Sequence, residues 1–226
     1  ERLKIECPKN SLKNSPISLS NTSQIRKPIL KKITLPRINK IGSRLALGCD
    51  NQISDLHAFT MFDHFYESGG RIFDTAYIYN HGKGDKYLGD WINSRGVAKD
   101  VIVIGKAAHT PECEPKFIRP QILESLDRLN IPKIDIFCLH RDNRDVPVDE
   151  FVDVLSDIQK EGLIEIYGAS NWELDRFSSA RANAKKNKKE PFSALSNNFS
   201  LAEMMQPVWP GCVGVNDKFL EYIINE

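Results

Sequence analysis

The sequence of 226 residues has no apolar run long enough to cross a bilayer and no secretory hydrophobic segment. Its five cysteines form no Cys-x-x-Cys pair, which argues against a zinc site built on close ligand pairs. An odd number of cysteines, with Cys49 and Cys138 inside apolar runs, indicates reduced thiols. We therefore expect a cytoplasmic protein with no metal site and no membrane partner.

Nucleotide-binding signatures are also missing. No Gly-x-Gly-x-x-Gly follows the first apolar run, which ends in LGCDNQ (47–52). The stretch His81–Gly84 (HGKG) has neither the spacing nor the Lys-Ser/Thr of a phosphate-binding loop. These absences disfavour an open wound sheet of the dinucleotide-binding type and a P-loop enzyme.

Acidic residues are scarce at the start of the chain. Residues 1–40 carry ten Lys or Arg against two Glu, a net charge of +8, and the remainder carries 21 basic against 28 acidic residues, a net charge of −7. A basic arm can bind nucleic acid or anionic lipid, but here Ser, Asn and Pro separate the basic residues and no aromatic residue lies among them. We predict a solvated basic leader or linker at 1–33, one domain at 34–226, and no nucleic-acid partner.

Short apolar runs rich in β-branched residues alternate with segments of helical period from residue 44 onward. The predicted strands are Arg44–Cys49, Arg71–Thr75, Val101–Lys106, Ile134–His140, Ile164–Ser170 and Phe192–Phe199. The predicted helices are Ser54–Ser68, Lys86–Ser94, Pro115–Asn130, Pro147–Gly162, Glu173–Ala184 and Lys218–Ile224. Apolar strands separated by helices predict parallel βα units, and the missing glycine fingerprint favours a (β/α)8 TIM barrel over an open α/β sheet.

Polar side chains end three consecutive predicted strands. Asp74 lies at the end of the second strand, Lys106 at the end of the third and His140 at the end of the fourth, while Tyr79 lies in the loop after Asp74. Barrels keep their sites at the carboxyl ends of their strands. A structural ion pair and a core histidine would explain each residue singly, but their occurrence on three adjacent strand ends favours a functional site.

Together these four side chains predict acid–base chemistry on a carbonyl group. A tyrosine hydroxyl has an unperturbed pKa of about 10, so it is a poor acid–base catalyst at neutral pH. A nearby Lys106 ammonium would lower the pKa of Tyr79, and Asp74 would keep that ammonium charged. His140 would hold the carbonyl oxygen while a nicotinamide cofactor supplies a hydride.

The motifs around these residues resemble the aldo/keto reductase family over roughly residues 34–222. FDTAYIYNHGKGDKYLG matches the family's Asp-x-x-x-x-Tyr segment and its Gly-x-x-Glu-x-x-Leu-Gly, with Asp85 where Glu is usual. VIVIGK, LHRD and GASNW match its Lys, His and Ser-Asn segments. The resemblance implies NADP (as NADPH), a small aldehyde or ketone as substrate, and a catalytic tetrad of Asp74, Tyr79, Lys106 and His140. Tyr79 is then the proton donor.

The resemblance also implies residues that bind the cofactor. Ser170 and Asn171 would hydrogen-bond the nicotinamide carboxamide, and Ser196 stands where many relatives have a Gln for the same task. Gly48 would lie where the first loop passes the nicotinamide ring, although a simple turn explains this glycine equally well.

Two further residues are candidates for binding the substrate. His109 either reaches the substrate or caps a loop, and Trp209 either lines a substrate loop or packs. Two other classes of function remain open. One is a barrel that binds or regulates without turnover, and the other is a metal-dependent hydrolase using Asp74, His109 and His140. The hydrolase would need a His-x-His on its first strand, where LALGCD has none.

Only six of the eight strands of such a barrel can be found in the sequence. In the family, the seventh and eighth units carry the aromatic residue that stacks on the nicotinamide and the basic cluster that binds the 2′-phosphate. We therefore expect a barrel truncated after about six βα units, a fragment of a longer polypeptide with little or no activity of its own. Some bacterial relatives with the SNNFSLAEM style of motif follow an upstream nucleotide-binding oxidoreductase domain, which the leader could join.

Overall fold

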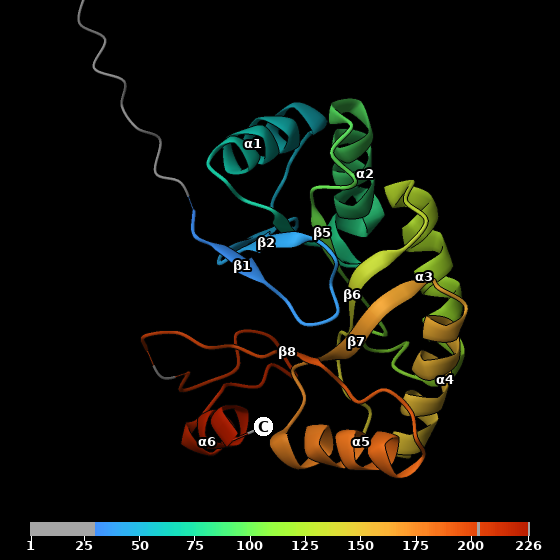
Figure 1. Ribbon diagram of the computed structural model, residues 1–226. Coiled ribbons are helices and arrows are strands. Elements are labelled where there is room, and N and C mark those ends of the chain that lie inside the picture. Colours follow the sequence, from blue (N-terminus) through green and yellow to red (C-terminus); the bar gives the residue numbers. More distant parts are fainter. Residues whose placement is uncertain (1–29, 203, 226) are drawn as a thin grey trace, which may run out of the picture.

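A computed structural model describes residues 30–202 and 204–225 (Figure 1). Six strands form one sheet in the order of the chain, and every neighbouring pair is parallel. The strands are β3 (Ala46–Gly48), β4 (Ile72–Asp74), β5 (Ile102–Ala107), β6 (Ile134–Leu139), β7 (Ile164–Ser170) and β8 (Ala194–Ser196). Each lies within or at the edge of a predicted strand, so the predicted parallel βα arrangement is confirmed.

Helices follow the strands and cover the outside of the sheet. They are α1 (Asp55–Glu67), α2 (Lys83–Arg95), α3 (Pro115–Leu129), α4 (Val148–Lys160), α5 (Leu174–Lys186) and α6 (Asp217–Asn225). In Figure 1, α1 to α5 form an arc around the curled sheet. The arrangement is that of a (β/α)8 barrel with six of its βα units, as predicted.

Two apolar layers hold the sheet together. The outer layer, between the strands and the helices, contains the large buried aromatic residues, among them Phe62, Phe73, Trp91, Phe137, Phe151 and Trp172. The inner layer, inside the curl, contains four isoleucines from neighbouring strands, Ile72, Ile102, Ile136 and Ile166. Successive residues of a strand point to opposite faces, so strands that are apolar throughout supply both layers. This explains why the strands read as continuous apolar runs.

A hairpin that the sequence did not predict packs against the inner layer. Strand β1 (Lys32–Thr34) pairs antiparallel with β2 (Ile41–Ser43), and Ile33 contacts the inner isoleucines. The hairpin begins inside the segment 1–33 expected to be a leader, because one short strand offers too little alternation to be recognised. Residues 1–29 of that segment lie outside the described residues.

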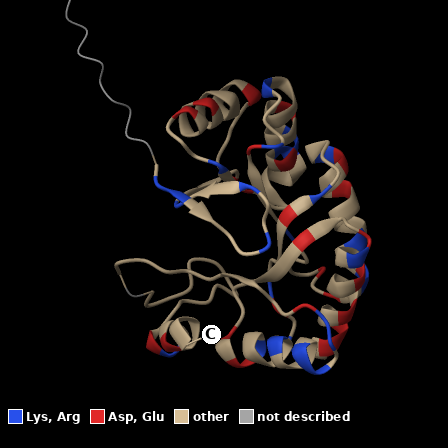
Figure 2. Ribbon diagram, in the orientation of Figure 1, with Lys and Arg blue, Asp and Glu red and all other residues tan. Residues whose placement is uncertain are grey.

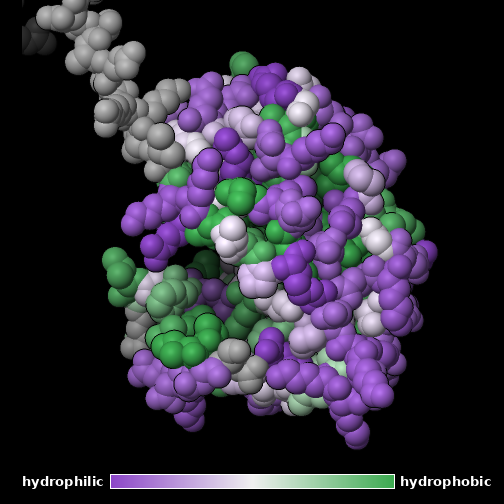
Figure 3. Space-filling view, viewed as in Figure 1, coloured by the Kyte–Doolittle hydropathy of each residue, from purple (hydrophilic) through white to green (hydrophobic). Residues whose placement is uncertain are grey.

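The segment 197–216, between β8 and α6, differs from the rest of the surface. Charged side chains follow the helices, whereas the described positions of this segment carry none (Figure 2). Exposed apolar side chains gather on it (Figure 3), namely Phe199, Leu201, Met205, Val208 and Trp209. Helix α6 adds the exposed side chains of Ile223 and Ile224. Helix α6 is anchored on α5, since its Tyr222 ring lies 6.4 Å from that of Phe177. Within the described chain, no helix is long and apolar enough to cross a membrane.

Candidate active site

An ion pair between a buried lysine and a partly buried aspartate joins the ends of β4 and β5. Lys106 is 4% exposed, and its ammonium forms an ion pair with the Asp74 carboxylate. The same ammonium donates to the backbone carbonyl of Thr75 at 3.0 Å. Burial lowers the pKa of Lys106, but the charges of Asp74 and Tyr79 outweigh it, and the net shift is upward. Lys106 is therefore an ammonium at neutral pH.

Tyr79 begins the short 3-10 helix η1 (Tyr79–Gly82) and lies over this pair. The Lys106 Nζ is 4.9 Å from the centroid of the Tyr79 ring. Gly84 fixes the approach of this turn, because a Cβ there would lie 3.0 Å from the Tyr79 Cβ and 2.7 Å from the Cys49 carbonyl oxygen. Burial raises the pKa of Tyr79, and Lys106 lowers it by less than burial raises it. The sequence therefore predicted the contribution of Lys106 correctly but not the net direction.

His140 follows the last residue of β6, and its backbone N–H donates to the Ala107 carbonyl at 2.7 Å. Its ring lies 5.6 Å from the Tyr79 ring and 4.9 Å from the His109 ring, centroid to centroid. Burial, then the charges of Lys106, His109 and Arg141, lower the pKa of His140 to about 2. The imidazole is therefore neutral, and its buried Nδ1 has no hydrogen-bond partner within the described chain.

One cavity of about 860 Å³ collects these side chains at the carboxyl edge of the sheet. Its lining includes nine of the residues that the sequence singled out, Asp74, Tyr79, Lys106, His109, His140, Ser170, Asn171, Ser196 and Trp209. Gly48 ends β3 outside this lining, where its carbonyl accepts from the Gln52 amide at 3.1 Å. The structure thus brings the four predicted catalytic side chains into one space, and Gly48 lies outside its lining, so its predicted place beside the nicotinamide ring stays a prediction.

The two substrate candidates both reach the cavity. His109 contacts the His140 ring and also forms a hydrogen bond with the neighbouring Thr110 carbonyl at 2.9 Å, so it serves the loop and the cavity together. Trp209 is 67% exposed, so it lines the cavity without packing in the core.

Ser170, Asn171 and Ser196 form a connected polar edge at the ends of β7 and β8. The Ser170 hydroxyl donates to the Ser196 carbonyl at 2.8 Å, and the Asn171 amide nitrogen donates to the Ser170 oxygen at 2.9 Å. The Asn171 amide oxygen accepts from the Val213 backbone N–H at 3.1 Å. Asn171 therefore joins β7 to the segment 197–216, whose described positions carry no charge.

The sequence profile of the aldo/keto reductase family matches residues 41–208, well over half of the chain. The chain belongs to the aldo/keto reductase family. An aldo-keto reductase from Strobilurus tenacellus, str7, is 28% identical over 150 residues, which are 65% of this chain and 42% of that protein.

Two solved structures are similar to this chain. The holo form of an aldo-keto reductase from Bacillus halodurans matches with a TM-score of 0.56 and 27% identity, over 62% of this chain and 50% of that one. A glycerol dehydrogenase from Gluconobacter oxydans matches with a TM-score of 0.61 over 73% of this chain and 54% of its own, and at 21% identity it supports the fold alone. The chain thus spans about half the length of these relatives.

Asp85, where the aldo/keto reductase motif usually has Glu, is fully buried in α2. Its carboxylate accepts from the Thr75 hydroxyl at 2.6 Å and from the Ser125 hydroxyl at 2.8 Å. Burial raises its pKa, and the two hydroxyl hydrogen bonds oppose that rise. Because Thr75 also accepts from Lys106, Asp85 positions the strand end that carries the ion pair.

Other cavity residues received no role from the sequence. Asn197 has a buried amide oxygen without a hydrogen-bond partner among the described residues, and Arg141 has a buried guanidinium nitrogen in the same condition. The position of Arg141 directly after His140 in LHRD could have marked it as a site residue, but the sequence does not show that its side chain is buried. Among the described residues, no group of three or more His, Cys, Asp or Glu is placed to hold a metal ion.

Proposed function

We propose that this member of the aldo/keto reductase family reduces an aldehyde or ketone to an alcohol by hydride transfer from NADPH. The observation that carries the proposal is the single cavity in which Tyr79 lies between the Lys106 ammonium and the neutral His140. An acid, a cation and a neutral hydrogen-bonding group around one space suit the reduction of a carbonyl oxygen.

Tyr79 donates the proton in this proposal. Because burial raises its pKa, the hydroxyl is fully protonated at neutral pH and holds the proton that the reduced oxygen needs. The phenolate left behind is stabilised by the Lys106 ammonium 4.9 Å from the ring centroid. Asp74 keeps Lys106 charged and fixed in place.

His140 orients the carbonyl oxygen. A neutral imidazole carries one N–H donor and one acceptor, and the buried Nδ1 is not engaged by the described chain. A ring N–H that faces the cavity would donate to the carbonyl oxygen and align that oxygen with the Tyr79 hydroxyl. Because the ring is neutral, it does not compete with Tyr79 as an acid.

The polar edge of the cavity fits a nicotinamide carboxamide. The orphaned Asn197 oxygen offers an acceptor to an amide N–H, and the Ser170 and Asn171 side chains lie beside it on the same lining. NADPH, when bound, supplies the hydride. The proposed preference for NADP over NAD rests on the family motifs and not on a phosphate-binding residue of the described chain.

The setting we propose is the cytoplasm, because Cys49, Cys113, Cys138 and Cys212 are all free thiols. The partner is a small carbonyl compound, and an upstream oxidoreductase domain remains a proposal that the leader motivates.

The proposal is tested with NADPH deuterated at its transferable position. The protein made from the complete natural coding sequence is incubated with a panel of aldehydes and ketones, and the alcohols are analysed by mass spectrometry. One deuterium per alcohol is expected. A protein that binds NADPH but gives no labelled alcohol with any carbonyl would be a binding or regulatory barrel and would refute the proposal.

A further inference from the structure

Arg141 is a buried cation without an acidic partner. It is 7% exposed, lines the cavity and follows His140 directly in the chain. No carboxylate of the described residues forms an ion pair with its guanidinium, unlike Lys106, which has Asp74. A buried charge is costly unless a counter-charge compensates it, so an unpaired guanidinium at a cavity wall is expected to meet an anion there.

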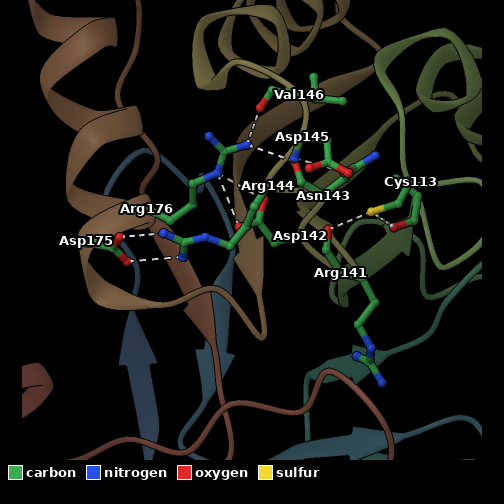
Figure 4. A network of polar contacts seen from close by, with 10 residues as sticks. Cys113, Arg141, Asp142, Asn143, Arg144, Asp145, Val146, Asp175 and Arg176 are labelled. Carbon is green, nitrogen blue, oxygen red and sulfur yellow. Dashed lines mark hydrogen bonds and ion pairs between the residues drawn. The ribbon is translucent and has the colours of Figure 1, made fainter.

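Two acidic residues shown near Arg141 in Figure 4 form ion pairs with other arginines. Asp142 pairs with Arg176 at 3.1 Å, and Asp175 pairs with Arg144 at 2.7 Å. In Figure 4 the Arg141 side chain extends away from both pairs.

Most of the donor capacity of Arg141 is unused. A guanidinium has five N–H donors. One Nη1 donor reaches the His140 carbonyl at 3.0 Å, and one Nη2 donor reaches the Cys212 sulfur, a weak acceptor, at 3.7 Å. The Nε is buried with no hydrogen-bond partner. An arginine that merely supported the loop would be expected to use its Nε as well.

The segment 209–212 covers the stem of Arg141. A Cβ on Gly211 would lie 3.3 Å from the Arg141 Cδ and 3.5 Å from its Nε, so this segment packs directly on the side chain. The segment carries no charge that could neutralise the guanidinium. Arg141 also lines the cavity, so an anion can approach the guanidinium from there.

We propose that Arg141 binds a carboxylate on the substrate, so that the preferred substrates are carbonyl compounds that carry an acidic group. The planar fork of a guanidinium matches a carboxylate, and Arg141 lines the same cavity as His140, which would hold the reacting carbonyl. This inference rests on the proposed function. It adds the class of substrate, which nothing in the tetrad specifies.

The test compares ω-oxo carboxylic acids of increasing length with their methyl esters, as NADPH-dependent substrates of the protein from the complete coding sequence. For at least one length, the wild type is expected to prefer the acid over the ester in kcat/KM by on the order of 30-fold, as for one charge-assisted hydrogen-bonded pair. Arg141→Gln is expected to abolish this preference, and Arg141→Lys to keep part of it. Arg144→Gln is the matched control and should keep the full preference. Equal use of acid and ester by the wild type would overturn the proposal without any variant.

Two measurements without turnover separate the possible sources of the anion. Succinate should raise the midpoint of thermal unfolding of the wild type and of Arg144→Gln, but not of Arg141→Gln. Affinity for NADPH, measured by fluorescence, should be the same in all three. If Arg141→Gln instead weakens NADPH binding while the acid-to-ester ratio is unchanged, the anion is a cofactor phosphate and the proposal is wrong. If no carbonyl is reduced but succinate still stabilises only proteins with Arg141, the anion site stands and the reductase proposal fails.

Discussion

The charge on the buried Lys106 side chain depends on its ion pair with Asp74. Lys106 keeps its ammonium only because Asp74 lies against it, and removing one partner of a buried pair leaves an uncompensated charge. We predict that Asp74→Asn lowers the free energy of unfolding by about 3–5 kcal/mol, measured by urea denaturation. The double variant Asp74→Asn/Lys106→Met should recover part of this loss, because the buried charge is then gone.

The control for this prediction is Asp90→Asn. Asp90 pairs with Lys86 on the surface of α2, where both side chains are at least half exposed, and such pairs contribute about 0–1 kcal/mol. Equal losses for Asp74→Asn and Asp90→Asn would show that the Asp74–Lys106 pair is not effectively buried.

His140 gives the stability a dependence on pH. Its pKa is about 2 in the folded protein against an ordinary value of 6.5, so the unfolded chain takes up a proton that the folded one refuses. Protonation of His140 in the unfolded chain therefore destabilises the folded protein at low pH. The free energy of unfolding should fall by up to about 1.4 kcal/mol per pH unit as pH drops from 6.5 towards 4. Urea unfolding of His140→Gln should show a correspondingly shallower dependence.

His81, which is exposed in η1, supplies the comparison for His140. His81→Gln makes the same exchange of an imidazole for an amide at an exposed position. An identical slope for wild type and His140→Gln between pH 6.5 and 4 would contradict the buried, neutral imidazole.

At the residue scale, the sequence predicted which residues form the site and at which strand ends they lie, but not how deeply their side chains are buried or what they contact. Asp74, Lys106 and His140 could be predicted because each ends an apolar strand, and strand ends meet at one edge of a barrel. The upward pKa of Tyr79 and the missing partner of Arg141 could not be predicted. Both depend on how deeply other segments bury the side chain, which no local pattern reports.

At the scale of elements, Asp85 links three pieces of the fold behind the site. It joins α2 to Thr75 after β4 and to Ser125 on α3. Asp85→Ala would leave two buried hydroxyls without their acceptor, and we predict a loss of about 2–4 kcal/mol in the free energy of unfolding by urea denaturation. Asp90→Ala, an exposed position of the same helix, is the control and should change it by less than about 1 kcal/mol. A loss for Asp85→Ala as small as that of the control would contradict the link.

The elements themselves were largely predictable. Six strands and six helices were read from apolar runs and helical spacing, because buried parallel strands and amphipathic helices leave distinct periods. The β1–β2 hairpin was missed, because each of its strands, KIT and IGS, contains a single large apolar residue and so forms no apolar run. The path of 197–216 also could not be predicted, because tertiary contacts such as the Val213–Asn171 hydrogen bond determine it.

At the scale of the whole molecule, the sheet of the described chain ends in two strands, β3 and β8, that are not paired with each other. The cavity beside them contains two Lys or Arg side chains, Lys106 and Arg141, and Asp74 already neutralises Lys106. NADPH carries several phosphate charges that need surface cations. We therefore predict that the 226-residue chain by itself binds NADPH weakly, with no saturation at micromolar concentrations in a fluorescence titration. Micromolar affinity would contradict this.

Membership in the aldo/keto reductase family was recognisable at this scale because the motifs lie on consecutive strand ends in a fixed order. The chemistry of a whole relative does not follow from half its length. The described chain contains the four predicted catalytic residues, and Tyr77 is a suitable control for substitutions of Tyr79. Tyr77, two residues earlier, donates its hydroxyl to Glu124 at 2.9 Å and stacks on Arg128, outside the cavity.

The role of Tyr79 is therefore tested by single-turnover NADPH oxidation with a reducible carbonyl, in the protein from the complete coding sequence. Tyr79→Phe should slow the hydride-transfer step by about 100-fold or more, as expected when a positioned general acid is lost. The single-turnover rate of Tyr77→Phe should stay within about threefold of the wild-type rate, because the Tyr77 hydroxyl contacts Glu124 outside the cavity. If Tyr79→Phe reduces the carbonyl as fast as the wild type and Tyr77→Phe, then Tyr79 is not the proton donor.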